Sequence, residues 1–469
     1  MPSFWLRTIL LCGLGSTLIG CGNDHNSSPT TPAPARAMSV TAPQNADLYI
    51  TNHQQPWVLL PHYQTLTLAH YKQHYFAPWQ TTESATAFDT GGSYIHIARY
   101  EHEQIKIFSH HPFWNSQYQR YPADWVQPIA DNMALDSFPN INQPAIALHN
   151  TAMRLMPTAV PAFENPNRAG QGYPFDDLQV DNVWAGTPVR MIQVSLDKAW
   201  TLIEAPDMFG WVESRDIAPV DARFMADWQA HPWAMTTVDS LPVQNSQGQT
   251  LFNAKIGAPY PLVQTTATGR EILVPVASPQ THQAMIAMAT LPLVKSTPLP
   301  LAGTKENFAK LINALQGEPY LWGGLKQGRD CSGTMRDLFA SFGVWLPRSS
   351  GDQVYVGRSV SLTGLTPVQK QQFIANNATP FATLIGYPGH VTLYIGNYDN
   401  TPYVFQNAWG LITHNLWGRE GRAIIGHTVI SPMNLGNDEF RTKTLLDKPL
   451  TIAYIAPPLS AQERLQTQQ

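Results

Sequence analysis

The stretch that most constrains the fold is residues 320–353, YLWGGLKQGRDCSGTMRDLFASFGVWLPRSSGDQ. A glycine-rich loop runs into Cys331, and the apolar residues that follow recur at spacings of three and four, which predicts an amphipathic helix. Gly343 stands where a left-handed cap would end that helix. A cysteine at a helix N-terminus meets unpaired backbone N–H groups and the positive end of the helix dipole, and both favour the thiolate. A small buried cysteine is the alternative.

The cysteine count favours a reactive thiol. The chain has three cysteines, Cys12, Cys21 and Cys331. Residues 1–20 hold one basic residue and then a short apolar run that ends in small residues, which is typical of a signal peptide. The letters LIGC at the end of this run have the pattern of a bacterial lipobox, so we expect lipid on Cys21. Cys331 would then be the single remaining thiol of an exported chain, and a nucleophile is the economical explanation.

A cysteine nucleophile needs a base, and usually a third group that orients the base. His390 opens a segment in which apolar and polar residues alternate, which predicts a strand. A short turn leads to a second predicted strand at 403–410, and pairing of the two would bring Gln406 or Asn407 near His390. The chain has fifteen histidines, so a histidine at the start of a strand is weak evidence by itself.

Four motifs in this part of the chain occur in the order seen in one known family. They are Tyr320-x-Trp322-Gly323-Gly324, Asp330-Cys331-Ser332-Gly333, Pro347-Arg348-x-Ser350 with Gln353, and Gly389-His390-Val391. On these motifs the chain resembles the NlpC/P60 cell-wall cysteine peptidases. The resemblance implies an α+β fold with a papain-like catalytic core, in which Cys331 is the nucleophile, His390 the base and Gln406 the third member. The family more often has histidine at the last position, and His414 and His427 are the other candidates for it.

The resemblance also implies the chemistry and the substrate. Cys331 and His390 would rest as thiolate and imidazolium, and the thiolate would attack an amide carbonyl. In the branch with bacterial SH3 (SH3b) domains, matching residues bind the free amine of an N-terminal L-alanine. We therefore expect cleavage between D-Glu and the diamino acid of trimmed stem peptides, with Asp330 as the carboxylate that faces the amine. Asp330 can also be the helix N-cap. The substrate-binding residues that the resemblance implies are Tyr320, Trp322, Asp330, Ser332 and Ser350, with the Tyr320 hydroxyl beside the oxyanion.

Two other functions stay open. One is an amidase or acyltransferase on the same fold. The other is a wall-binding SH3b protein with a decayed peptidase, because Gln406 departs from the family pattern. No cofactor is expected. His110-His111 suggests a metal pair, but adjacent residues of a strand point to opposite faces, so we expect no metal.

The rest of the chain divides into small modules. The predicted division is a signal peptide at 1–20, the lipidated cysteine and a flexible linker at 21–46, an N-terminal accessory domain at 47–140, two small SH3b-type barrels at 141–220 and 221–299, the catalytic domain at 300–457 and a polar tail at 458–469. The linker is predicted because this segment is rich in Ser, Thr, Pro and Asn and has little to bury. Trp200 and Trp211 are expected in the first barrel core, and Asp176 and Asp177 would face substrate if that barrel overhangs the cleft.

Composition limits the partners and the location. The net charge is −4 and the pI is near 6.4, so nucleic acid is not an expected partner. After the N-terminal run, no segment approaches the ~20 apolar residues of a membrane span, so lipid on Cys21 would be the anchor. We expect an exported lipoprotein on the periplasmic face of a membrane, the outer membrane if the cell is Gram-negative, that acts on peptidoglycan stem peptides or muropeptides.

Overall fold

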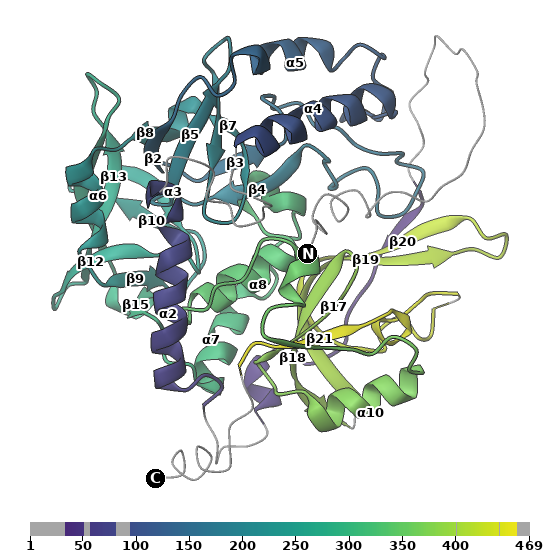
Figure 1. The fold of residues 1–469 in the computed structure, drawn as a ribbon. Helices are drawn as coiled ribbons and strands as arrows, with labels where there is room; N and C mark the ends of the chain where they lie inside the picture. Colours follow the sequence, from purple (N-terminus) through teal and green to yellow (C-terminus); the bar gives the residue numbers. More distant parts are fainter. Residues whose placement is uncertain (1–32, 51–56, 81–93, 400, 440, 457–469) are drawn as a thin grey trace.

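The computed structural model describes residues 33–456 apart from 51–56, 81–93, 400 and 440. The predicted signal peptide, Cys21 and the polar tail therefore lie outside the described residues. Figure 1 shows helical and β-sheet regions arranged around one central helix, α8 (Cys331–Ala340). Within the described ranges, no helix is both long and apolar enough to cross a bilayer.

The N-terminal region is mainly helical. Its elements are η2 (Ala46–Tyr49), α2 (Pro61–Tyr75), α3 (Ala77–Gln80), α4 (Tyr94–His110), α5 (Gln127–Asn132) and η3 (Leu135–Ser137). Pro61 occupies the first turn of α2, where a missing N–H removes no helix hydrogen bond. The buried rings of Tyr71 and Tyr75 on α2 belong to the same hydrophobic core as Phe308 and Met335 near the C-terminal half of the chain. The accessory region is thus packed against the domain that holds the predicted nucleophile.

The His110-His111 pair lies at the C-terminal end of α4, not on a strand as the sequence argument assumed. The His110 Nδ1 atom contacts the carbonyl oxygen of Lys106 at 2.7 Å. Among the residues that the structure describes, no group of three or more His, Cys, Asp or Glu side chains could hold a metal ion.

Two β domains follow the helices. The first has a sheet in the order β4-β3-β7-β6-β5-β2-β8, and the second has a sheet in the order β14-β13-β12-β9-β15 with a separate hairpin, β10-β11. The first domain comprises β2 (Gln143–Ala147), β3 (Thr151–Arg154), β4 (Gln179–Val183), β5 (Pro188–Val194), β6 (Trp200–Glu204), β7 (Phe209–Glu213), η4 (Ser214–Asp216) and β8 (Ile217–Pro219). The second comprises α6 (Ala222–Gln229), β9 (Trp233–Thr236), β10 (Leu241–Gln244), β11 (Thr250–Ala254), β12 (Tyr260–Thr265), β13 (Arg270–Ala277), β14 (Ala284–Leu291), η5 (Leu293–Lys295) and β15 (Ser296–Leu299).

Trp211 lies in the core of the first β domain, as expected, and is fully buried. Its indole N–H donates a hydrogen bond to the Glu101 carboxylate on α4 (3.1 Å), so the indole also joins this domain to the N-terminal helices. Trp200 is half-buried and packs against the same apolar cluster.

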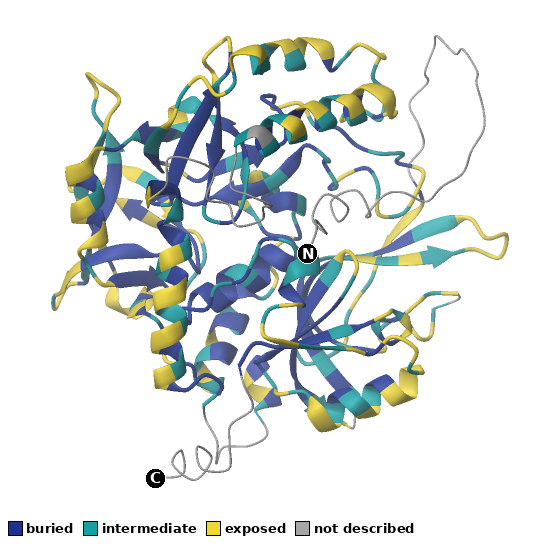
Figure 2. Ribbon diagram, in the orientation of Figure 1, coloured by how far each residue is buried: buried dark blue, intermediate teal, exposed yellow. Residues whose placement is uncertain are grey.

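The C-terminal domain is built on a seven-stranded sheet in the order β1-β20-β19-β18-β17-β21-β16. Its elements are α7 (Lys305–Leu315), η6 (Trp322–Gln327), α8, α9 (Ser350–Gln353), β16 (Arg358–Ser361), α10 (Pro367–Asn377), β17 (Thr383–Tyr387), β18 (His390–Tyr398), β19 (Thr401–His414), β20 (Glu420–Pro432), η7 (Leu445–Asp447) and β21 (Thr451–Tyr454). The predicted hairpin is β18–β19, which pair antiparallel. Both strands are longer than predicted because β19 continues into a second hairpin with β20. Figure 2 shows that α8 and the central strands are buried, whereas the outer face of α2 and the end of the β19–β20 hairpin are exposed.

The flexible linker predicted for 21–46 is wrong for its described part. Strand β1 (Ala35–Ala37) pairs parallel with β20, with Ala35 opposite Arg422. A strand that joins the edge of a sheet is held by backbone hydrogen bonds, which need no apolar side chains. Composition therefore could not reveal this strand.

Candidate active site

Cys331 is the first residue of α8, as the sequence predicted. Asp330 is the N-cap, and its carboxylate accepts a hydrogen bond from the Gly333 N–H at 2.9 Å. Met335, Leu338 and Phe339 on the same helix are fully buried in the core. Cys331 itself is 5% exposed. The helix is therefore fixed from its cap to its last turn, and the thiol is placed at its N-terminus with little freedom.

Burial of the thiol opposes the thiolate that the helix position favours. Burial raises the pKa of Cys331 to about 12, and the Asp330 carboxylate adds to this shift. The N–H groups of Val391 and Ser332 act in the opposite direction but do not outweigh burial. Burial also lowers the pKa of His390, although Gln406 and Asp330 favour its charged form. Burial therefore favours the neutral form of both groups.

The sulfur lies at the start of β18, next to the residue that follows the predicted base. The backbone N–H of Val391, the residue after His390, makes a hydrogen bond to the Cys331 thiol. Helix α8 packs on both β18 and β19. Two segments that are distant in the sequence thus bring the cysteine and the histidine to one place.

His390 is oriented by Gln406. Its Nε2 atom lies 2.8 Å from the Gln406 side-chain oxygen on β19. The Gln406 amide nitrogen donates to the Ser431 hydroxyl on β20 at 2.7 Å, which leaves the amide oxygen to accept from the histidine. Nε2 therefore carries the hydrogen, and Nδ1 is the nitrogen that can accept a proton.

The other residues considered for the third position lie elsewhere. His427 directs its Nδ1 atom to the Thr428 carbonyl oxygen (2.8 Å), and His414 pairs with Glu420 at the far end of β19. Asn407 turns to the opposite side, where its amide donates to the Arg329 carbonyl (2.9 Å) and the Thr334 hydroxyl (3.1 Å). It braces the start of α8 and does not hold the histidine.

The carboxylate of Asp330, the predicted selector of a substrate amine, already accepts hydrogen bonds from protein groups. Arg348 donates to both oxygens of Asp330, at 3.1 and 2.6 Å, and to the Ser332 hydroxyl at 2.8 Å. Burial acts to raise the pKa of Asp330, but Arg348 and the N–H groups of Gly333 and Gly323 hold it below its usual range. The negative charge is thus already matched inside the protein.

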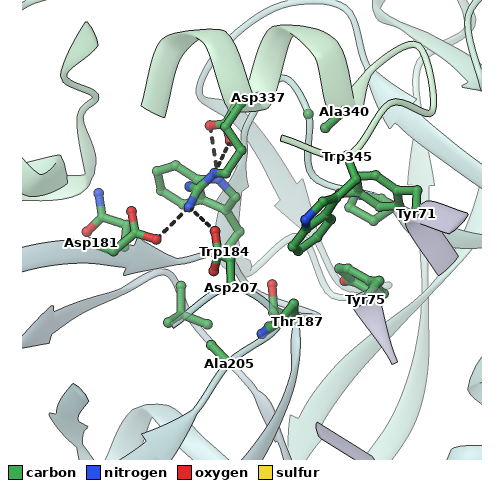
Figure 3. A pocket seen from close by; sticks show the side chains of 16 residues that line it. Tyr71, Tyr75, Asp181, Trp184, Thr187, Ala205, Asp207, Asp337, Ala340 and Trp345 are labelled. Carbon is green, nitrogen blue, oxygen red and sulfur yellow. Dashed lines mark hydrogen bonds and ion pairs between the residues drawn. The ribbon is translucent and has the colours of Figure 1, made fainter. Parts of the chain in front are cut away.

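Arg348 and Arg336 connect the helix of the nucleophile to the first β domain. Arg348 Nε donates to Asp181 on β4 at 2.7 Å. Arg336 reaches three carboxylates, those of Asp181, Asp207 and Asp337. Figure 3 shows Asp181, Asp207 and Asp337 around one guanidinium, next to a cavity of about 60 Å³ with aromatic side chains on its other side. No motif in the sequence signalled this network.

The second β domain is tied to α8 in the same way. Arg329, just before the N-cap, donates to Asp337 (2.7 Å) and to Asp239 (2.9 Å). Lys255 also contacts Asp239, at 3.0 Å. Both β domains therefore hold the nucleophile helix through buried ion pairs.

Two of the remaining predicted substrate residues, Tyr320 and Trp322, pack against an aromatic ring of the first β domain. The ring of Phe175, from the loop before β4, lies 5.4 Å from Trp322 and 6.1 Å from Tyr320 between ring centroids. The Gln179 amide donates to the Gly323 carbonyl at 2.9 Å. The first β domain thus covers this loop, as expected. Ser350 is half-buried at the start of α9.

Of the two acidic residues in the covering loop, one is paired and one is not. Asp176 pairs with Arg154 at 2.5 Å. Asp177 has a buried carboxylate oxygen without a hydrogen-bond partner among the described residues. Burial, followed by repulsion from Glu164 and Asp176, holds the pKa of Asp177 well above its usual range. Asp177 is therefore the acidic group here that no cation of the described residues pairs with, and its burial favours the neutral carboxyl.

Family comparisons assign most of this architecture. The model of the NlpC/P60 family matches residues 317–404, and the N-terminal stabilising domain of such proteins matches 10–138. An SH3 domain of SH3b1 type matches 161–213, and one of SH3b2 type matches 221–267.

Individual relatives agree with these matches. The chain is 35% identical over 95 residues to the gamma-D-glutamyl-L-lysine dipeptidyl-peptidase of Bacillus subtilis (strain 168), which is 20% of this chain and 30% of the relative. It is 38% identical over 99 residues to the peptidoglycan endopeptidase RipB of Mycobacterium tuberculosis, 17% of this chain and 35% of the relative. The chain therefore spans about a third of the length of these curated relatives.

One solved structure is similar over most of the chain. It is an NlpC/P60 endopeptidase from Photobacterium damselae subsp. piscicida, with a TM-score of 0.80 and 26% identity over 89% of this chain and 98% of that chain. The predicted α+β architecture is confirmed. The chain combines an N-terminal stabilising domain, two SH3b domains and an NlpC/P60 catalytic domain.

Proposed function

We propose that this protein is a cysteine peptidase that cleaves peptidoglycan stem peptides, with Cys331 as nucleophile, His390 as general base and Gln406 as the residue that orients the base. The observation that carries the proposal is the hydrogen bond between His390 Nε2 and Gln406, with the Cys331 thiol at the same strand end. This leaves the unprotonated Nδ1 atom as the proton acceptor, which a thiol nucleophile needs.

In the proposed reaction, the proton moves when substrate binds rather than beforehand. His390 Nδ1 accepts the proton of Cys331 as the sulfur attacks the amide carbonyl carbon, and the carbonyl oxygen becomes an oxyanion. Backbone N–H groups at the start of α8 are suited to stabilise that oxyanion. The imidazolium then protonates the departing amine. Water hydrolyses the thioester with His390 as base, which regenerates the thiol.

The substrate bond that we propose is the one between γ-D-Glu and the diamino acid. The name of the Bacillus subtilis relative describes cleavage of such a bond with lysine as the diamino acid. We further propose that the free amine of an N-terminal L-alanine binds Asp177 instead of Asp330. The carboxylate of Asp330 is matched by Arg348, whereas the carboxylate of Asp177 is buried and unmatched. An ammonium group would offset the cost of burying that charge.

Mass spectrometry of L-Ala-γ-D-Glu-diaminopimelate incubated with the protein tests the main proposal. The wild type should release L-Ala-D-Glu, and Cys331→Ala should release none. If the wild type cleaves no muropeptide, a wall-binding role for the SH3b domains becomes the better explanation. If products arise from another acyl bond, the protein is an amidase or acyltransferase.

The same assay with an N-acetylated peptide tests the amine site. The wild type should prefer the free amine, and Asp177→Asn should lose that preference while it keeps activity on the acetylated peptide. Glu164→Gln, which changes the neighbouring carboxylate, is the matched control. Equal rates of the wild type on both peptides would remove the amine from the proposal and leave the peptidase untouched.

We also propose that the mature protein is a lipoprotein attached through Cys21, on the evidence of the LIGC pattern after the apolar run. Intact-mass measurement of membrane-extracted protein should find lipid on the N-terminal cysteine, and Cys21→Ser should yield unlipidated protein. An unlipidated wild type would contradict this assignment.

A further inference from the structure

The β19–β20 hairpin ends in two exposed apolar side chains. The last ladder pair is His414 with Glu420, so the turn comprises residues 415–419. Within it, Leu416 is 74% exposed and Trp417 is 87% exposed. Figure 1 shows the hairpin projecting from the C-terminal domain, and Figure 2 shows that its end is exposed. A large apolar side chain so fully in water at a projecting point indicates a contact with something else.

The turn is preformed rather than loose. The Asn415 side-chain oxygen accepts hydrogen bonds from the N–H groups of Trp417 (3.0 Å) and Arg419 (2.9 Å). Gly418 takes a left-handed conformation, with φ of 79°, and its N–H donates to the Asn415 carbonyl. The turn therefore presents the indole outward in a defined conformation.

The direction of β1 places the N-terminal segment at the same end. β1 runs parallel to β20, with Ala35 opposite Arg422 and Ala37 opposite Ile424. Because β20 begins at Glu420, next to the turn, the chain that precedes Ala35 approaches from the side of the turn. The Pro34 carbonyl accepts a hydrogen bond from the Arg422 N–H at 2.7 Å, which fixes this register at its start.

The length of chain before β1 then limits the distance to a lipid on Cys21. About 14 residues separate Cys21 from Ala35, and a chain of that length reaches at most about 50 Å when fully extended. A bilayer that holds this lipid therefore lies within that distance of Ala35, the residue at which the chain enters β1 beside the hairpin turn.

The residues at the turn suit a bilayer surface. Tryptophan is enriched at the membrane–water interface, and basic side chains next to apolar ones favour anionic lipid headgroups. Arg419 is exposed beside Trp417. The acidic neighbour Glu420 is turned to the protein, where its carboxylate accepts from the Ala169 N–H at 3.1 Å.

We infer that the turn Leu416-Trp417-Gly418-Arg419 is a membrane contact that enters the headgroup region of the bilayer to which Cys21 is attached. The contact would set the orientation of the catalytic domain relative to the membrane. The inference rests on the proposed lipid attachment and is independent of the proposed peptidase activity.

A single fluorescent label on the turn tests this. In mature Leu416→Cys/Cys331→Ala, the label has one free thiol to react with, because the lipid occupies Cys21 and Cys12 leaves with the signal peptide. The lipidated protein, labelled with bimane, is reconstituted in phosphatidylethanolamine–phosphatidylglycerol vesicles that contain lipid with a headgroup nitroxide. We expect the label to lose most of its emission. The matched control is Val294→Cys/Cys331→Ala, because Val294 is 86% exposed in the second SH3b domain, and its label should keep its emission.

The outcomes separate the two assumptions. Intact mass shows whether Cys21 is lipidated, so failure of that assignment is seen directly. In lipidated protein, no quenching at 416, or equal quenching at 294 and 416, would overturn the membrane contact. Sedimentation with purified sacculi that is lost in Trp417→Ala, without quenching at 416, would assign the turn to the wall and likewise overturn it. Cleavage of the soluble tripeptide by Trp417→Ala at the wild-type rate would show that the variant is folded.

Discussion

Replacement of Gln406 by leucine tests whether this residue serves the chemistry. Gln406 is 4% exposed, so an apolar side chain can take its place. Leucine has a similar size but no polar atom, so the substitution removes the hydrogen bonds to both His390 and Ser431. A hydrogen bond to a neutral imidazole contributes about 1 kcal/mol, whereas one to an imidazolium contributes about 1.5–3 kcal/mol. Burial favours neutral His390 in the free enzyme, so the imidazolium forms during the reaction. The transition state therefore loses about 0.5–2 kcal/mol more than the free enzyme, which predicts a decrease in kcat/KM of about 2- to 30-fold.

The pH dependence gives a second readout that a purely structural role would not change. The hydrogen bond that His390 donates to the Gln406 oxygen raises the pKa of His390, against the lowering by burial. Its loss in Gln406→Leu should lower that pKa further, so the acidic limb of the kcat/KM profile should move to lower pH. Gln406→Glu places a negative charge beside the imidazole and should move the limb to higher pH.

The assay is release of L-Ala-D-Glu from the tripeptide, followed by mass spectrometry at a series of pH values, with a thermal unfolding curve for each variant. His427→Gln is the matched control, because His427 contacts the Thr428 carbonyl instead. An unchanged kcat/KM and pH profile in Gln406→Leu would refute the argument. An equal loss in His427→Gln would assign the third position to His427.

Three further predictions concern stability and domain contacts. Asp181→Ala removes a carboxylate that Arg348 and Arg336 share, so the free energy of unfolding measured in urea should fall by about 3–5 kcal/mol. Asp227→Ala breaks the exposed pair with Arg223 and should cost less than about 1 kcal/mol. Burial raises the pKa of Glu101 to about 8, although Trp211 donates to its carboxylate. Between pH 4.5 and about 8, the folded protein keeps the Glu101 proton that the unfolded chain loses. The free energy of unfolding should therefore fall as pH rises through this range, by at most about 1.4 kcal/mol per pH unit. Glu101→Gln should flatten this slope. Gly323 has φ of 56°, and an added Cβ would lie 2.3 Å from the Gln179 carbonyl oxygen. Gly323→Ala should therefore lower both the melting temperature and the activity. Gly170 also has a positive φ but lies in open space, so Gly170→Ala should lower the melting temperature and leave the activity unchanged.

The features that the sequence predicted are those with a local signal. Helix α8 begins after Asp330, whose carboxylate accepts from the Gly333 N–H, and its apolar side chains repeat at helical spacing. The β18–β19 hairpin follows from alternating residues around a short turn, and that pairing was enough to select Gln406 as a neighbour of His390.

The features that the sequence missed depend on contacts between distant segments. Asp181 and Asp239 lie far along the chain from Arg348 and Arg329, and only the folded structure brings each aspartate to its arginine. The ionisation of Cys331 depends on burial that a helix-end motif does not encode. Helix α2 has histidines and aromatic residues around its circumference, without an apolar stripe to reveal it.

The parallel pairing of β1 with β20 has a consequence for the order of events during biogenesis. A strand near residue 35 acquires its partner only when the segment near residue 422 has been synthesised. Contacts of such long sequence separation form late, because closing a large loop is slow. The first strand of the chain therefore waits for one of the last before it is held in place. Assembly of the sheet that carries His390 is completed only after nearly all of that sheet has been synthesised.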